Sequence, residues 1–423
     1  MKPFFEKVGL VLKDPVIRKR IVFTVLALIV FRLLSSIPIP GVDVLSLDRL
    51  LAGNQLLGLL DIFSGGGISR LSIVMLGVGP FITASIIMQV MTMVFPKLKS
   101  QMQEEGDAGR MRLSQWSRYL SVPLAFLQSF AFLKLLESQN ILQHLTMTSF
   151  VLNVLVVTAG SLLLMWVGEL ISEFGIGNGV SLIIFAGIVA TLPSQIAQFV
   201  VSFDPQQLPY YALFLAIAVG VIALVVLVTE AERPIPVTYA KQVRGNSVSG
   251  GTSTYLPFRL NQAGVIPIIF ALSILLLPQV AAQFLAESAN ATVASIAGGV
   301  SSFLGNSWYY SAIYFVLVFL FTYFYTAITF DPQRIAENLQ KGGAFVPGVR
   351  PGDATALHLA KIVTRITFVG AIFLALIAVL PLILQAVTGN AALAIGGTAL
   401  LIVVSVVLDL VKRIDAQAAM REY

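Results

Sequence analysis

The residue types that usually carry catalysis or bind metals are scarce in this chain. It has no cysteine and only two histidines, His144 and His358, which excludes disulfides, thiolate metal sites and cysteine nucleophiles. The histidines are far apart in sequence and lack ligand spacing, so we interpret both as solvated loop residues. The chain also lacks an H-E-x-x-H motif, a serine–lysine or aspartate pair for intramembrane hydrolysis, and a Gly-x-x-x-x-Gly-Lys-Ser/Thr motif for ATP. The sequence predicts no catalytic residues, no metal site and no cofactor.

Ionisable residues are also rare within the apolar stretches. Arg32 lies inside one of them, and Glu169 and Glu230 lie at the ends of two others. Transporters coupled to protons or sodium usually carry such residues at mid-membrane, whereas a pathway lined by aliphatic side chains excludes ions by dewetting. The residues themselves favour an apolar pathway. They leave open a secondary transporter for small solutes and a scaffold membrane protein without a pore.

The composition places the chain in a membrane. Of its 423 residues, 57% are hydrophobic and 11% are charged, and the mean hydropathy is +0.89. Soluble domains are about 45–50% apolar and about 25% charged. So few charged side chains cannot cover a soluble core of this size, which excludes a soluble multidomain enzyme, a disordered chain, and a collagen-like or disulfide-rich fold.

Ten apolar runs are each long enough to cross about 30 Å of hydrocarbon as a helix. They lie at roughly residues 21–38, 71–95, 119–136, 150–168, 180–201, 210–229, 263–285, 309–330, 366–388 and 391–411. Lipid offers backbone groups no hydrogen-bond partners, so these runs must be helical. They are continuous and not alternating, which excludes a β-barrel. The predicted fold class is an all-α integral membrane protein with ten transmembrane helices.

The distribution of the 27 lysines and arginines orients these helices. Six precede the first run, five lie between the second and third, four between the sixth and seventh, five between the eighth and ninth, and three follow the tenth. The opposite connections hold only Arg49, Arg70 and Lys134. Because basic residues concentrate on the cytoplasmic side, both termini are predicted to be cytoplasmic.

Ten spans divide into five plus five, and an odd number in each half requires any structural repeat to be inverted. Residues 1–20 carry an apolar face opposite their lysines, and we expect them to lie along the cytoplasmic membrane surface and not to be a cleaved signal peptide. The predicted divisions are the N-terminal segment 1–20, the N-terminal half 21–201, an external hinge link 202–209, the C-terminal half 210–411 and a cytoplasmic tail 412–423.

Two features depart from simple spans. Residues 61–80 contain a triple glycine followed by Gly77-Val78-Gly79-Pro80, which cannot form one rigid helix. They are either an exposed loop or a short half-inserted helix that moves on a glycine hinge. The cytoplasmic connections 230–262 and 330–365 are long and basic. They either satisfy the charge bias alone or dock a large anionic partner, such as a ribosome whose RNA phosphates attract arginine and lysine.

The chain resembles the SecY family, the central subunit of the bacterial protein-translocation channel. The stretches that carry the resemblance are IPIPGVD (37–43), DIFSGGGISRLSI (61–73), GVGPFITASIIMQ (77–89), GDAGRMRLSQWSRY (106–119), GELISEFGIGNGVSLIIFAGIVATLP (168–193), ERPIPVTYAK (232–241), GGTSTYLPFRLNQAGVIPIIF (250–270), FDPQRIAENLQKGGAFVPGVRPG (330–352) and GGTALLIVV (396–404). They extend from the first predicted helix to the last. The most specific are GIGNGVSLIIFAGIVA and STYLPFRLNQAGVIP.

The resemblance implies a pore between two inverted five-helix halves, sealed at its waist by a ring of aliphatic side chains. The ring residues would be Val78, Ile82, Ile184, Ile188, Ile269 and Ile402. It also implies a plug at about residues 62–72, comprising Ile62, Phe63, Ser64, Gly65, Gly66, Gly67, Ile68, Ser69 and Arg70. Unfolded secretory polypeptides would cross through the ring once the plug has moved away.

A lateral gate would open between the second and third spans on one side and the seventh and eighth on the other. Gln89, Asn261 and Gln262 lie near that seam, and hydrophobic segments would leave through it into lipid. The implied partners are the small membrane subunits SecE and SecG, the SecA motor ATPase, the ribosome, signal peptides and membrane lipid. The loop after Lys241 is less basic than is usual in the family, so we expect Arg244, Arg259 and Arg350 to carry more of the partner docking.

Overall fold

The computed structural model describes most of the chain. The described residues are 14–40, 61, 64, 66–95, 98, 106–138, 142, 146–201, 208–239, 242–244, 247–249, 253–286, 291–388 and 396–419. Several predicted features lie outside them, including most of the N-terminal segment, most of the link between the halves, His144, and three plug residues (Ile62, Phe63 and Gly65).

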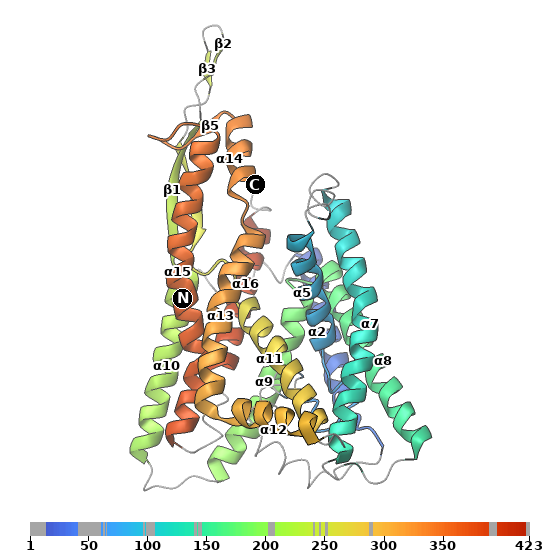
Figure 1. The fold of residues 1–423 in the computed structure, drawn as a ribbon. Helices are drawn as coiled ribbons and strands as arrows, with labels where there is room; N and C mark the ends of the chain where they lie inside the picture. Colours follow the sequence, from blue (N-terminus) through green and yellow to red (C-terminus); the bar gives the residue numbers. More distant parts are fainter. Residues whose placement is uncertain are drawn as a thin grey trace.

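Each of the ten apolar runs coincides with a helix (Figure 1). The helices are α2 (Pro15–Leu34), α5 (Gly79–Val94), α7 (Asp107–Ser138), α8 (Met147–Phe174), α9 (Gly179–Val201), α10 (Leu208–Glu230), α11 (Ile266–Ala286), α13 (Ser307–Thr329), α15 (Asp353–Thr388) and α16 (Gly396–Ala419). Over the described residues, four segments are long and apolar enough to cross a membrane: Met111–Glu137, Met147–Phe174, Ser307–Lys341 and Asp353–Ile383. Five shorter apolar helices accompany them.

Local sequence sets several of the helix starts. Asp14, Thr146 and Asn306 precede α2, α8 and α13, and each side-chain oxygen accepts a backbone N–H from the first turn. Such caps satisfy amides that have no partner within the helix.

Two further helices were not predicted, α12 (Ala291–Gly305) and α14 (Pro332–Lys341), and the latter is capped by Asp331. His358 lies exposed on α15, so the prediction of a loop position for it is wrong.

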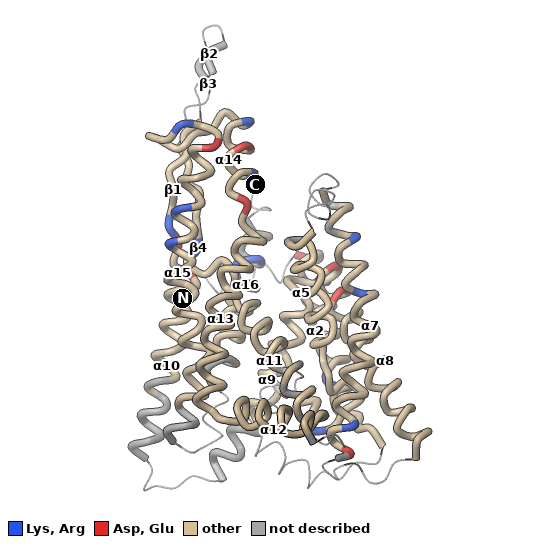
Figure 2. The backbone as a smooth tube through the Cα atoms, viewed as in Figure 1, with Lys and Arg blue, Asp and Glu red and all other residues tan. Residues whose placement is uncertain are grey.

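The helices gather into two groups in Figure 1. In one, α8 contacts α2, α7 and α9, and α7 contacts α5; in the other, α13 contacts α11 and α15, and α16 contacts α10 and α15. The groups meet where α9 contacts α16 and where α11 contacts α5 and α7. In Figure 2 the charged residues lie mostly toward the ends of the helices, and the middle of the bundle is free of them.

The prediction of an all-α fold is wrong in the long connections. Strands β1 (Glu232–Tyr239) and β4 (Ser253–Arg259) form an antiparallel ribbon, and β5 (Ala344–Phe345) pairs with the other edge of β1. A small hairpin of β2 (Gln242–Arg244) and β3 (Ser247–Ser249) extends it (Figure 1). On β1 only the alternating residues Ile235 and Val237 are buried, packed in a cluster with residues of α15 such as Leu359. This period of two is the spacing of a strand that is covered on one face.

Candidate functional site

The largest apolar cluster contains all six residues that were predicted to form a ring. Four are buried, Val78, Ile184, Ile188 and Ile402, each at most 2% exposed; Ile82 and Ile269 are half-buried and pack against the same cluster. They come from the start of α5, from α9, from α11 and from α16. Segments far apart in sequence thus bring six aliphatic side chains into one apolar cluster. Their action as a ring stays a prediction.

A close helix contact positions the two ring residues on α9. At Gly179, the first residue of α9, an added Cβ would lie 1.8 Å from the carbonyl oxygen of Gly168 on α8. The Gly179 N–H also donates to Ser172 Oγ, at 2.8 Å. Glycine is therefore required here for the approach of α9 to α8. Ile184 and Ile188 follow about one and a half and two and a half turns later on the same helix.

The predicted plug segment is a succession of turns and not a continuous helix between residues 66 and 78. Its N-terminal part is bonded internally: Ser64 Oγ accepts the N–H groups of Gly67 and Ile68, and the Asp61 carboxylate accepts both the N–H and the hydroxyl of Ser69. Arg70 is exposed, and its Nη1 lies 3.5 Å from Ser36 Oγ. Ile68 belongs to a second apolar cluster built largely from α7 and α8.

Asp61 lies in the connection between the first two spans and is mostly buried. Burial raises the pKa of its carboxyl above the ordinary value of 3.8, although the bonds from Ser69 and the charge of Arg70 act in the opposite direction. Desolvation disfavours the charged form. The carboxyl therefore holds a proton more readily in this structure than it would in water.

Of the three residues predicted for the lateral seam, Gln89 lies on α5, and Asn261 and Gln262 lie in the segment between β4 and α11; α5 and α11 contact each other. Gln89 and Gln262 are half-buried. Asn261 is buried; its Nδ2 donates to the Gly264 carbonyl at 3.3 Å, and its Oδ1 has no partner among the described residues. On the other side of α11, Phe270 meets Phe321 and Tyr325 of α13 edge to face at 6.0 Å. No hydrogen bond between described residues joins Gln89 to Asn261 or Gln262.

The three arginines predicted for docking lie on the ribbon and beside it. Arg244 ends β2, and Arg259 ends β4, where its Nε lies 3.3 Å from Glu232 Oε1 across the ribbon. Arg350 is exposed, and its carbonyl accepts the Thr355 hydroxyl at 2.8 Å. An open pocket of about 280 Å³ lies between the ribbon and α15. It is lined by Ala231, Glu232, Arg233, Phe258, Leu260, Arg365, Ile366 and Val369.

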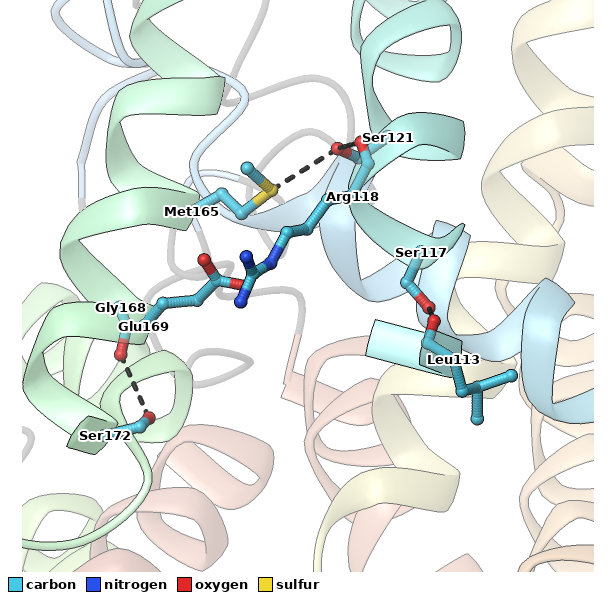
Figure 3. A network of polar contacts seen from close by, with 8 residues as sticks. All are labelled: Leu113, Ser117, Arg118, Ser121, Met165, Gly168, Glu169 and Ser172. Carbon is cyan, nitrogen blue, oxygen red and sulfur yellow. Dashed lines mark hydrogen bonds and ion pairs between the residues drawn. The ribbon is translucent and has the colours of Figure 1, made fainter. Parts of the chain in front are cut away.

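Sequence reasoning missed two ion pairs, each of which joins two helices. Arg118 of α7 pairs with Glu169 of α8, and nearby Ser121 Oγ lies 3.4 Å from Met165 Sδ (Figure 3). Lys412 of α16 pairs with Glu230 of α10 at 2.9 Å. The sequence signal was a lone acid at the end of an apolar run, which by itself does not identify its partner.

Sequence reasoning also missed a polar strip on α8. Asn153 and Ser161 are buried within an apolar run, and each donates a side-chain hydrogen bond to a backbone carbonyl outside the helix, those of Pro40 and Gly77. Gly160 lies between them on the same face. The signal available was the spacing of small and polar residues at i, i+7 and i+8, which places them on one helical face.

Comparison with known proteins shows the family. The family model described as SecY matches residues 72–411. Among curated relatives, the protein translocase subunit SecY of Mycobacterium tuberculosis is 39% identical over 439 aligned residues, covering 96% of each chain. The protein of the same name from Staphylococcus aureus is 40% identical over 420 residues, again covering 96% of each chain.

Solved structures show a similar fold at lower identity. One described as "The structure of a protein conducting channel" has a TM-score of 0.61 and 19% identity, covering 97% of this chain and 94% of the other. One described by the plug domain of the SecY protein has a TM-score of 0.64 with the same identity and coverage. Sec61 in a canine ribosome-channel complex has a TM-score of 0.59 and 18% identity, with the same coverage.

Proposed function

The chain belongs to the SecY family, so it is a multi-pass membrane subunit of a protein-conducting channel and not an enzyme, and from that premise we propose how it conducts polypeptides. Its ten spans form two inverted five-helix halves, residues 21–201 and 210–411, around a central pore in the bacterial cytoplasmic membrane. Both termini are cytoplasmic. The coincidence of each apolar run with a helix, and the two groups of helix contacts, support this arrangement.

The observation that carries the proposal is the apolar cluster that unites Val78, Ile82, Ile184, Ile188, Ile269 and Ile402. A collar of aliphatic side chains closes around an extended polypeptide of any sequence and forms no hydrogen bond that would retain it. When empty, an apolar constriction resists wetting and so resists ion leakage. An unfolded secretory chain therefore passes while ions do not.

Residues 62–72 act as a plug that seals the empty pore and leaves when a polypeptide enters. The internal hydrogen bonds of Ser64 and Asp61 support a unit that moves as one piece. Hydrophobic segments leave sideways between α5 and α7 on one side and α11 and α13 on the other, past Gln89, Asn261 and Gln262. Burial of apolar surface in lipid favours this exit by about 25 cal/mol per Å².

The cytoplasmic face receives partners that supply the driving force. The ribosome or the SecA motor docks on the ribbon and the neighbouring loop through Arg244, Arg259 and Arg350, and SecE and SecG complete the membrane complex. Reversing the three charges to glutamate is expected to weaken ribosome and motor binding. The same reversal of Lys134, on the opposite side, is the control. Binding unchanged by the triple reversal would contradict the docking assignment.

A cysteine scan tests the pore directly, because the natural chain has no cysteine. Ile82→Cys and Ile269→Cys should each crosslink to a stalled, translocating polypeptide. The matched control is Leu155→Cys, on the exposed side of α8 at 55% exposure, which should not. No crosslink from either ring position in an active complex would refute the pore assignment.

Two other results would favour the alternative functions. Saturable solute uptake coupled to an ion gradient would favour a transporter, and no conductance after deletion of residues 62–72 would favour a scaffold.

A further inference from the structure

The segment that joins the plug to the second span has two parts with different hydrogen-bond partners. In residues 64–70, the bonds between described residues stay within residues 61–72, apart from Arg70 to Ser36. Residues 72–77 form bonds among themselves and one from the Ser72 N–H to the Gly67 carbonyl, but unlike residues 64–70 they are also bonded through backbone groups to other parts of the chain. The Ile73 N–H donates to the Ile37 carbonyl at 2.9 Å, and Ser72 forms a β-bridge with Pro38.

Helix α8 holds this second part from the other side. Ser161 Oγ donates to the Gly77 carbonyl at 2.9 Å, and this bond is buried. At Gly160 an added Cβ would lie 2.1 Å from the Ile73 carbonyl oxygen and 3.3 Å from Val74 Cγ1. The backbone of residues 73–77 therefore lies directly on the backbone of α8, at a distance that only glycine allows.

The same face of α8 also contacts residues 37–40, which form the other side of the β-bridge. Asn153, two turns before Gly160, is fully buried, and its Nδ2 lies 3.4 Å from the Pro40 carbonyl. Val154 and Val157 on this face pack in the cluster that contains Leu71 and Met75. One face of α8 thus contacts both residues 37–40 and residues 71–77.

The junction between the two parts is Leu71. Its φ is +41°, the one positive value for a residue other than glycine among the described residues. Such a backbone costs free energy for a leucine and persists only where its surroundings enforce it. Val74, after the junction, lies in the same cluster as the ring residues, while Met75 shares the second apolar cluster with Ile68, before the junction.

We propose that α8 is a fixed seat for residues 72–77, held by Gly160 and Ser161, and that the plug pivots at Leu71 and not at the Gly77–Gly79 hinge. The inference rests on the proposed plug and deepens it. Its physical reason is that Val78 follows the seated residues directly. A pivot at Gly79 would carry Val78 out of the ring, and a pivot at Gly77 would pull residues 73–76 off α8, whereas a pivot at Leu71 lets the plug leave while Val78 keeps its place. Gly160 and Ser161 are positioning residues.

Thiol accessibility separates the two parts. Ile68→Cys and Val74→Cys are introduced singly, and the assembled membrane complex is treated with a maleimide, empty and then loaded with a stalled polypeptide. Both positions are buried in this structure, at 3% and 0% exposure. The expected result is that loading exposes Ile68→Cys and leaves Val74→Cys unreactive. Labelling of both would refute the proposal that residues 72–77 stay fixed on α8. Labelling of neither would overturn plug movement itself, and with it the inference.

Substitution of the seat gives a second, independent test. Ser161→Ala leaves a buried carbonyl unpaired and should lower the ratio of seated to unseated segment about five- to hundredfold, and Gly160→Ala should lower it further. Both should raise the ion conductance of the resting channel in a planar bilayer and leave the translocation rate unimpaired. Gly298→Ala and Ser302→Ala on α12 are matched controls, since the former meets nothing within 4 Å and the latter bonds only its own helix. Resting conductance equal to that of the controls, while deletion of residues 62–72 raises it, would refute the seat alone.

Discussion

The contact between α8 and α9 offers a stringent test of how the pore residues are positioned. In Gly179→Ala the new methyl would lie 1.8 Å from the Gly168 carbonyl oxygen, 2.7 Å from the Gly168 carbonyl carbon and 2.9 Å from Ile171 Cβ. Two of these are backbone atoms of a helix, which cannot rotate away as a side chain can. Ordinary contact begins near 3.4 Å, so the helices must separate locally by roughly 1.6 Å.

The separation has two measurable consequences. Overpacking of this kind costs about 1–3 kcal/mol, so the thermal unfolding midpoint of the purified complex should fall. A gap of about 0.5–1 Å already forfeits a quarter to a half of a van der Waals contact, so Ile184 and Ile188 should pack less closely in the ring cluster. The resting channel should therefore conduct more ions in a planar bilayer.

The matched control is Gly220→Ala on α10, where an added Cβ meets nothing within 4 Å. Alanine is favoured over glycine in a helix by about 1 kcal/mol, so this variant should be as stable as the natural protein or more so, and it should not leak. If Gly179→Ala matches Gly220→Ala in both midpoint and conductance, the helix contact does not position the ring residues and the reasoning is refuted.

Three further predictions concern other parts of the chain. Asp61→Asn removes the charge that burial disfavours and keeps a side-chain oxygen that can accept the Ser69 N–H, so it should lower resting conductance. Because burial raises the pKa of Asp61, a closed plug binds a proton more tightly than an open, hydrated plug. Closure should therefore weaken as the pH rises from 3.8 through the raised pKa. Recording conductance against pH checks this, and a pH dependence that persists in Asp61→Asn would contradict it. Ile402→Ala, at a site only 1% exposed, should lose about 2–5 kcal/mol of stability and increase the leak, whereas the exposed Val407→Ala on the same helix should do neither. Glu169→Gln, whose partner Arg118 is 47% exposed, should cost under about 1 kcal/mol; a large fall in the unfolding midpoint would show that the pair is worth more than its exposure implies.

Features that depend on local sequence could be predicted. The ten apolar runs coincide with ten helices because hydropathy and helix formation are properties of consecutive residues, and in lipid a run has no alternative to the helix. The family resemblance predicted six ring residues, and all six fall in or against one apolar cluster, although by composition alone no isoleucine on α9 differs from its neighbours. The ribbon of β1 and β4 was missed, since Ile235 and Val237 form too short an alternation to be recognised without the α15 surface that buries them.

The sequence by itself determined that this protein lies in a membrane and that its apolar runs are nearly free of charge. Tertiary structure decided which faces meet. Three contacts cannot be predicted from the linear pattern: Gly160 with the Ile73 carbonyl, Ser161 with Gly77, and Gly179 with Gly168. Each contact joins two segments at an angle and a depth that the residues along one helix do not specify. The proposals for the place of the aliphatic ring and for the moving part of the plug segment rest on those contacts.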